Sequence, residues 1–164
     1  MKLSECKIGV VVQNTIPTNG VIDGSLGHVV GLTLNTYESL LAHAKRGGHT
    51  NCCGPIALSL ISGESFDVSH HRLTHNGYRK SKRSGVKNGS VEAILDSLGW
   101  VSTKIEVPAH IKTNKSLAGQ LDPSKKYLIK YSNHYAVYVN GTLEDWSEGN
   151  LKRVVGIMEM TPPE

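Results

Sequence analysis

The sequence predicts an α+β fold in which a helical middle segment precedes a C-terminal antiparallel sheet. Three observations support this prediction. Residues 7–34 contain two β-branched runs separated by turn-forming residues, residues 36–99 show apolar positions at helical spacing, and after Gly99 the apolar pattern changes to a period of two. A chain of 164 residues can form one compact domain and a small appendage. We therefore predict a β-rich N-terminal extension over 1–35 and a main domain over 36–164.

The composition is that of an ordinary globular protein, with 38% hydrophobic and 20% charged residues. No apolar stretch approaches the length that a membrane span requires, and the first residues lack the apolar core and cleavage site of a signal peptide. The three cysteines are an odd number and two of them are adjacent, which argues against a disulfide framework. We therefore predict a cytoplasmic protein with no membrane partner.

Positive charge is concentrated in one stretch of the chain. No acidic residue occurs between Val68 and Val91, and the stretch contains six of the 18 basic residues: Arg72, Arg79, Lys80, Lys82, Arg83 and Lys87. We predict that residues 76–89 form an exposed, solvated loop. The alternative is a surface that attracts an acidic partner or nucleic acid. Together with the N-terminal extension, that surface would make the protein a non-catalytic binding module.

Local start and stop signals predict the helices. Asn35 and Glu38 form a capping-box pattern ahead of residues 37–46, and two glycines end that helix. Further helical patterns cover 55–62, with Gly63 as the stop, 68–75, and a segment capped by Ser90 and ended by Gly99. Strand patterns follow at 100–107, 126–131, 134–140, 142–146 and 151–160.

Two adjacent cysteines stand at the start of the second predicted helix, in "HTNCCGPIALSLISG" (residues 49–63). A thiolate in the first turn of a helix faces unpaired N–H groups and the positive end of the helix dipole, which lower its pKa. We predict that Cys53 is a nucleophile and that Cys52 is structural. Gly54 has no side chain to obstruct a substrate carbonyl.

A histidine and a carboxylate further along the chain are candidate partners for this thiol. Asn140-Gly141 is a strong two-residue hairpin signal, and that turn pairs Ala136 with Asp145. Because strand side chains alternate faces, His134 and Asp145 then share one face and Glu144 lies on the other. The register therefore predicts a Cys53–His134–Asp145 site, as in thiol hydrolases.

A metal site is the alternative reading of the cysteines, with His70, His71 and His75 as further ligands. Adjacent cysteines are not the spaced pair of a structural zinc site, and no second pair of ligands has the standard spacing. We therefore predict neither a metal nor a cofactor.

The segments "NCCGPIAL", "HYAVYVNG" and "DW" resemble the papain-like cysteine peptidase superfamily, and "SGVKNGSVEAILDSLGW" is similar to its small bacteriophage-encoded members. The resemblance implies a papain-like fold and hydrolysis of a peptide or isopeptide bond in a protein or peptide substrate. It also implies an acyl-enzyme intermediate, with Cys53 as nucleophile, His134 as base and Asp145 as the orienting residue. For a phage-encoded protein, the location would be the host cytoplasm.

The sequence departs from this family at the oxyanion donor. Papain-like enzymes commonly have a glutamine a few residues before the nucleophile, and here two glycines and His49 occupy that region. Asn51 and His49 are candidate donors beside the Cys53 N–H, and Gln13 is a more distant one. The N-terminal extension resembles a β-hairpin or part of a small SH3-like barrel.

Overall fold

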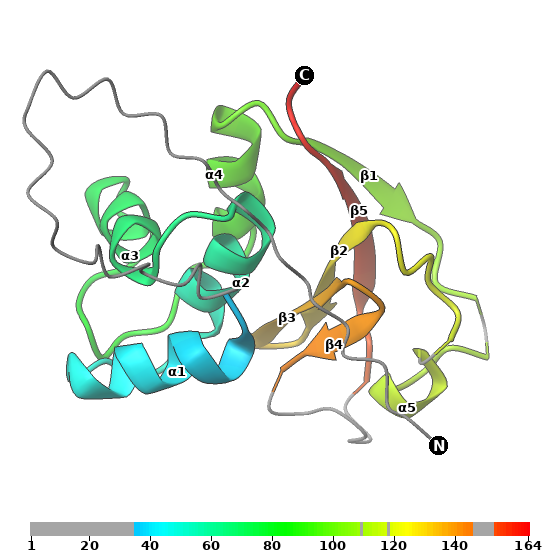
Figure 1. The fold of residues 1–164 in the computed structure, drawn as a ribbon, viewed down its shortest axis with the longest axis horizontal. Coiled ribbons are helices and arrows are strands. Elements are labelled where there is room, and N and C mark those ends of the chain that lie inside the picture. Colours follow the sequence, from blue (N-terminus) through cyan, green and yellow to red (C-terminus); the bar gives the residue numbers. More distant parts are fainter. Residues whose placement is uncertain (1–34, 109, 118, 146–152) are drawn as a thin grey trace, which may run out of the picture. The chain divides into compact units, whose positions relative to one another are not determined.

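An antiparallel five-stranded sheet with helices against one face forms the frame of the structure, an α+β architecture as predicted (Figure 1). The computed structural model describes residues 35–108, 110–117, 119–145 and 153–164. These belong to Leu34–Glu164, one of two units into which the chain divides. The extension predicted over 1–35 lies outside the described residues, except for Asn35.

Neighbouring strands of the sheet all pair antiparallel, in the order β1-β5-β2-β3-β4. The strands are β1 (Val101–Ile105), β2 (Lys126–Tyr131), β3 (His134–Val139), β4 (Thr142–Glu144) and β5 (Gly156–Thr161). The first four lie within segments predicted as strands, whereas β5 begins five residues later and ends one residue later than predicted. Asn140 and Gly141 have φ values of 52° and 78°, as a two-residue hairpin turn requires.

The described residues form five helices: α1 (Tyr37–Arg46), α2 (Cys53–Ser62), α3 (Phe66–His75), α4 (Ser90–Ser97) and α5 (Asn114–Leu117). The helical pattern predicted at 68–75 is confirmed within α3. The predicted cap of α4 is wrong, because Gly89 takes the N-cap position with a φ of 78° and Ser90 is the first helical residue. The Ser90 hydroxyl instead donates to the Lys87 carbonyl at 2.6 Å.

The capping box of α1 also differs from the prediction. Thr36 is the N-cap, and its hydroxyl accepts a hydrogen bond from the backbone N–H of Ser39, whose hydroxyl in turn accepts one from the Thr36 N–H. We had expected Asn35 and Glu38 in these roles. The Asn35 amide instead donates to the Glu64 carbonyl at 3.1 Å. The side chain predicted to cap α1 therefore forms a long-range hydrogen bond.

The central helix, α2, is buried along almost its whole length. It begins at Cys53, two residues earlier than predicted, and ends at Ser62; Gly63 follows as the C-cap, and its φ of 79° is left-handed as expected of a helix stop. Residues 54–61 are all buried, because α2 contacts α1, α3, α4, β2 and β3. At its carboxyl end the Lys126 ammonium donates to the Ile61 carbonyl at 2.7 Å, which complements the helix dipole.

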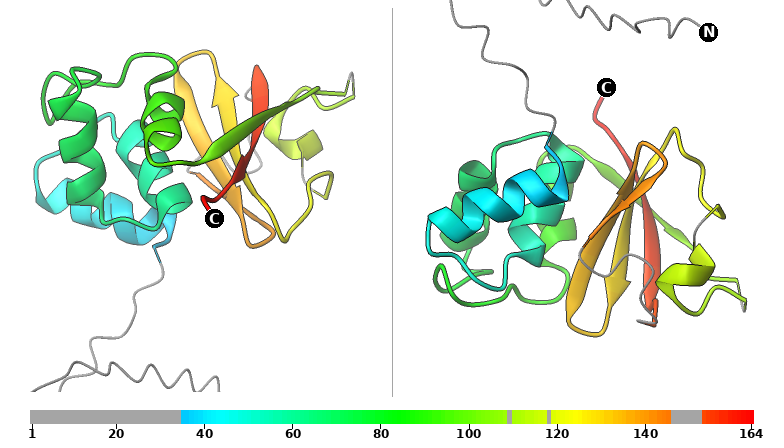
Figure 2. Two further views of the ribbon diagram at one scale, coloured as in Figure 1. Left: turned by 90° about the horizontal axis from the view of Figure 1, so that it is seen from above. Right: turned by 60° about the horizontal axis from the view of Figure 1, so that its bottom comes forward.

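The sheet separates two hydrophobic cores (Figure 2). Since successive strand residues point to opposite faces, Tyr135 and Val137 of β3 pack in the core that contains α2. Ala136 and Tyr138 pack in the second core, with Leu117 of α5. The strand that begins with His134 is therefore held from both sides.

Gly54 has a packing role that the sequence alone does not indicate. A Cβ atom at this position would lie 2.6 Å from Cγ2 and 2.7 Å from Cγ1 of Val86. The loop before α4 therefore approaches the first turn of α2 this closely because residue 54 has no side chain.

We expect Gly54→Ala to lower the free energy of unfolding by about 1–3 kcal/mol through this overlap, although alanine favours helices more than glycine does. Urea denaturation measures the change. Val86→Ala removes the overlapping methyl groups, so the double variant should recover part of the loss. An effect of Gly54→Ala that is the same with and without Val86→Ala would contradict this explanation.

Candidate active site

Cys53 is the first residue of helix α2. Cys52 is the N-cap but forms no side-chain capping hydrogen bond, so no capping side chain competes for the N–H groups of the first turn. The backbone N–H groups of Tyr135 and Gly54 donate to the Cys53 sulfur. A thiolate at this position therefore faces these donors and the positive end of the helix dipole.

The neighbouring thiol has a different environment. Cys52 is buried, whereas Cys53 is partly exposed, which is the difference in burial that we predicted. Arg79 Nη2 lies 3.9 Å from the Cys52 sulfur. Burial raises the pKa of the Cys52 thiol, and the hydrogen bond from Arg79 offsets this only in part.

His134 and Asp145 come together because β3 and β4 pair in the predicted register. Val137 is opposite Glu144, so Asp145, the next residue, lies on the same face of the sheet as His134. His134 Nε2 is 2.7 Å from Asp145 Oδ1, and the carboxylate is fully buried. Glu144 instead accepts a hydrogen bond from the backbone N–H of Tyr37 at 2.6 Å.

Cys53 and His134 are hydrogen-bonded, and this contact shifts both pKa values toward an ion pair. Burial raises the pKa of the Cys53 thiol, but the hydrogen bonds from His134 and Tyr135 and the charge of His134 outweigh burial and leave that pKa below its ordinary value. Burial lowers the pKa of His134, but hydrogen bonds with Asp145 and Cys53 raise it to about 9. Between these two pKa values the pair is a thiolate and an imidazolium.

The ring nitrogens of His134 have separate tasks. Because Nε2 lies against Asp145, Nδ1 is the nitrogen that can exchange a proton with Cys53. Tyr37 stands beside these groups, and burial, followed by the charges of Asp145 and Cys53, raises the pKa of its phenol to about 12. This phenol therefore remains neutral.

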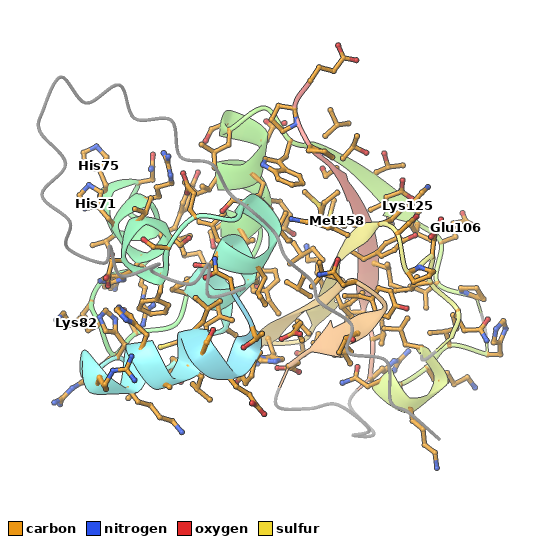
Figure 3. The ribbon with its side chains drawn as sticks, viewed as in Figure 1. His71, His75, Lys82, Glu106, Lys125 and Met158 are labelled. Atoms are coloured by element: carbon orange, nitrogen blue, oxygen red, sulfur yellow. The ribbon has the colours of Figure 1, made fainter. Side chains whose placement is uncertain are left out.

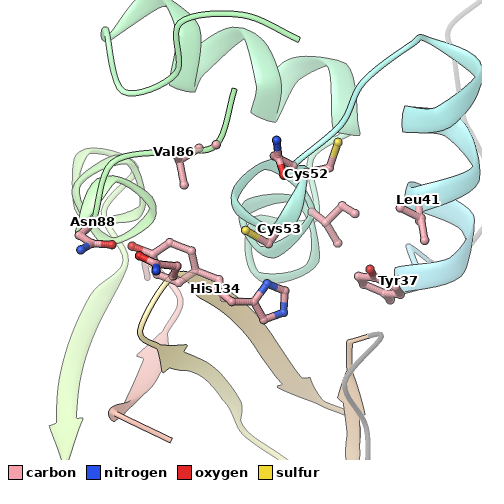
Figure 4. A pocket seen from close by; sticks show the side chains of 12 residues that line it. Tyr37, Leu41, Cys52, Cys53, Val86, Asn88 and His134 are labelled. Atoms are coloured by element: carbon pink, nitrogen blue, oxygen red, sulfur yellow. The ribbon is translucent and has the colours of Figure 1, made fainter. Parts of the chain in front are cut away.

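A pocket of about 590 Å³ opens over Cys53 and His134 (Figure 4). It is lined by four parts of the chain: Tyr37 and Leu41 of α1; Asn51, Cys52, Cys53 and Ile56 at the start of α2; Gly85, Val86 and Asn88; and Asn133, His134 and Tyr135 at the start of β3. In Figure 4, Val86 and Asn88 stand on one side of the pair, and Tyr37 and Leu41 on the other. An extended segment can therefore lie across the thiol.

Of the three predicted oxyanion donors, Asn51 lines the pocket and His49 does not, while Gln13 lies outside the described residues. Asn51 lines it with a left-handed φ of 52°, and its amide donates to the Arg83 carbonyl at 2.8 Å. His49 is buried instead, with its ring edge against the rings of Phe66 and His70 at centroid distances of 5.0 and 4.5 Å.

Two further amides line the pocket, those of Asn88 and Asn133, and amides of this kind can stabilise an oxyanion. Asn133 could have been found from its place directly before His134. No sequence pattern indicates that Asn88 lines the pocket, because its position depends on residues 76–89 folding back onto the start of α2.

The expectation that Arg79 belongs to a solvated basic loop is wrong. Its side chain is only 1% exposed, and its guanidinium donates to the carbonyls of Thr50 (2.7 Å), Ser81 (3.0 Å) and Lys82 (2.8 Å). Within the described ranges no carboxylate forms an ion pair with it. The loop is therefore wrapped around a buried cation.

The other basic residues divide into two groups. Arg72 forms a two-point ion pair with Glu64, at 2.8 and 2.6 Å, so its charge is neutralised. The remaining four are exposed, and we call them the basic rim: Lys80, Lys82, Arg83 and Lys87. None of the four forms an ion pair with a residue that the structure describes.

The histidines considered as metal ligands are separated from the cysteines. His71 and His75 stack on each other on the exposed side of α3, with ring centroids 5.7 Å apart (Figure 3), and His70 contacts His49. Across the residues that are described, no group of three or more His, Cys, Asp or Glu is placed to hold a metal ion.

Comparison with known proteins identifies no relative: no protein-family model, no curated protein and no solved structure matches the chain. In the described part of the chain no helix has the length and apolar character needed to cross a membrane. What the protein does is therefore inferred from the geometry of this site.

We expect iodoacetamide to alkylate Cys53 about tenfold or more faster than Cys52 at about pH 7, because their pKa values shift in opposite directions. Fragment-ion mass spectrometry separates the adjacent residues. In His134→Ala the burial of Cys53 remains, while the hydrogen bond from His134 and its positive charge are lost. The pH at which alkylation of Cys53 reaches half its maximal rate should therefore rise. His71→Ala, which changes an exposed histidine, is the control. An unchanged rate–pH profile in His134→Ala would rule out the ion pair.

We expect Arg79→Met to lower the free energy of unfolding by about 1–3 kcal/mol, because it removes the hydrogen bonds from one buried guanidinium to three part-buried carbonyls. Lys80→Met changes the exposed neighbour and should alter stability by less than about 0.5 kcal/mol. Urea denaturation compares the two. Equal losses of unfolding free energy in the two variants would mean that Arg79 does not stabilise the loop.

Proposed function

We propose that the protein is a thiol-dependent hydrolase that cleaves an amide bond of a peptide or isopeptide through Cys53, His134 and Asp145. One observation carries this proposal. The thiol at the start of a buried helix is hydrogen-bonded to a histidine whose other ring nitrogen lies 2.7 Å from a buried carboxylate. A thiol, an imidazole and a carboxylate in this sequence of contacts are the groups that form and hydrolyse an acyl-enzyme.

In the first half of the reaction the Cys53 thiolate attacks the substrate carbonyl carbon and forms a C–S bond. N–H groups in the first turn of α2 and a pocket amide stabilise the negative charge that develops on the carbonyl oxygen. The His134 imidazolium gives its Nδ1 proton to the leaving nitrogen as the C–N bond breaks. The products are an amine, a thioester on Cys53 and a neutral imidazole.

In the second half a water molecule gives a proton to Nδ1 of His134 and its oxygen attacks the thioester carbon. The C–S bond breaks, a carboxylic acid leaves, and the thiolate–imidazolium pair is restored. Asp145 exchanges no proton; it holds the ring orientation and stabilises the imidazolium. Because the pKa of His134 is about 9, the acid needed in the first half is lost above about that pH.

The arrangement of elements supports a papain-like assignment. A helix that begins at a cysteine packs against an antiparallel sheet; the histidine is the first residue of β3, and the carboxylate directly follows the neighbouring strand β4. This is the order that the resemblance of "NCCGPIAL" and "HYAVYVNG" implies. The amides that line the pocket suit a peptide backbone, whose N–H and C=O groups need partners.

We expect p-nitrophenyl acetate, an activated ester that requires no particular peptide sequence, to acetylate Cys53 and to be turned over. Release of p-nitrophenol gives the rate, and mass spectrometry gives the acetylated residue. Cys53→Ala and His134→Ala should lower turnover about 100-fold or more, and Asp145→Asn about tenfold or more.

Cys52→Ser is the matched control, because it changes the adjacent thiol and should keep most of the turnover. Acetylation of Cys52 in preference to Cys53, or turnover that survives His134→Ala, would contradict the proposed function.

A further inference from the structure

We propose that the substrate of this site is an acidic peptide segment, and that the basic rim binds its carboxylates on one side of the scissile bond. The inference rests on the proposed function, since the thiol defines where the scissile bond lies. It adds the chemical class of the substrate and the direction in which the substrate lies across the pocket.

The basic rim is attached to one wall of the pocket. Val86 and Asn88 line that wall, and Lys87 lies between them with its side chain exposed. The Arg83 carbonyl accepts hydrogen bonds from the Thr50 hydroxyl at 3.2 Å and from the Asn51 amide at 2.8 Å. These bonds hold the segment against the turn that leads into Cys53.

The side chains of the rim are exposed, while backbone carbonyls of the same segment are bonded to the rest of the fold. The carbonyls of Ser81 and Lys82 accept hydrogen bonds from the buried Arg79, and the Lys82 side chain, labelled in Figure 3, is exposed. Its ammonium lies 3.4 Å from the carbonyl of Gly47, directly after the exposed Arg46 at the end of α1. The positive surface thus continues from the pocket wall to the end of α1.

Two acidic residues lie near the opposite wall of the pocket, at the start of α1. Glu38 is exposed in the first turn of α1, and Glu144 lies beside the same turn, bonded to the Tyr37 N–H. A carboxylate on the substrate is attracted to the basic rim and repelled from the acidic start of α1. A substrate with acidic residues on one side of the cleaved bond is therefore bound in one direction.

A peptide fits these observations better than a nucleic acid. The thiol acts on an acyl carbon, which a peptide offers at every residue. Binding of bases requires exposed aromatic rings for stacking, but Tyr78, the aromatic residue within 76–89, is half-buried and packs against the core around α2.

Electrophilic peptides of matched length test the proposal on the full chain. One series carries a vinyl sulfone at its C-terminal end and the other a chloroacetyl group at its N-terminal end, so that the peptides extend in opposite directions from the thiol. Each series has an Asp-Glu, an Asn-Gln and a Lys-Lys member, and the rate of Cys53 modification is measured. In one series only, we expect the acidic member to react about tenfold faster than the amide member at low ionic strength.

Salt and charge reversal provide the controls. The advantage of the acidic member should almost disappear in about 1 M NaCl, where the Debye length is about 3 Å. It should be lost in Arg83→Glu/Lys87→Glu and kept in Lys104→Glu/Lys115→Glu. The control variant makes the same change of net charge at exposed residues of β1, on the far edge of the sheet, and of α5.

The following outcomes would contradict either the acidic substrate or the proposed hydrolase function. Equal rates for acidic and amide peptides, with labelling that still requires His134, would overturn the acidic substrate and leave the hydrolase proposal standing. Labelling that is insensitive to His134→Ala would overturn the hydrolase itself. Protection of Cys53 from iodoacetamide by a short single-stranded oligonucleotide, with no discrimination among the peptides, would overturn the proposal in favour of nucleic acid binding.

Discussion

Burial of α2 along its length is the constraint on which the rest of the site depends. Residues 54–61 are all buried, so only the end residues Cys53 and Ser62 are partly open to solvent. A helix surrounded in this way cannot shift or rotate without opening cavities or forcing overlaps. The position of the thiol is therefore determined by core packing. The same helix has its positive end at Cys53, while Lys126 neutralises its negative end.

The sheet determines the other half of the site through one two-residue turn. The turn at 140–141 sets which residues after it lie opposite β3. A slip of one residue would exchange the faces of Glu144 and Asp145 and would place the wrong carboxylate beside His134. In the observed register both carboxylates are used, because Glu144 anchors the start of α1 while Asp145 orients the histidine.

Features that depend on neighbours in the sequence could be predicted, whereas features that depend on distant contacts could not. The strand register and the stop of α2 follow from a hairpin dipeptide and a glycine, and both are confirmed. The cap of α1 was misassigned because Asn35 bonds a carbonyl 29 residues away. The burial of Arg79 and the place of Asn88 in the pocket require residues 76–89 to fold back onto Thr50, and no periodic pattern records such a contact.

Arg79 connects the interior of the fold to the charge on its surface. Four exposed cations on one short loop repel one another, yet carbonyls before and within that loop converge on the buried guanidinium and hold the loop in shape. The cationic side chains of this loop are exposed, and the same segment supplies Val86 and Asn88 to the pocket wall. The buried cation is itself without a carboxylate partner in the described residues, so it adds to the positive potential there. For the proposed function, this positive potential favours a substrate that carries carboxylates on the side of the basic rim.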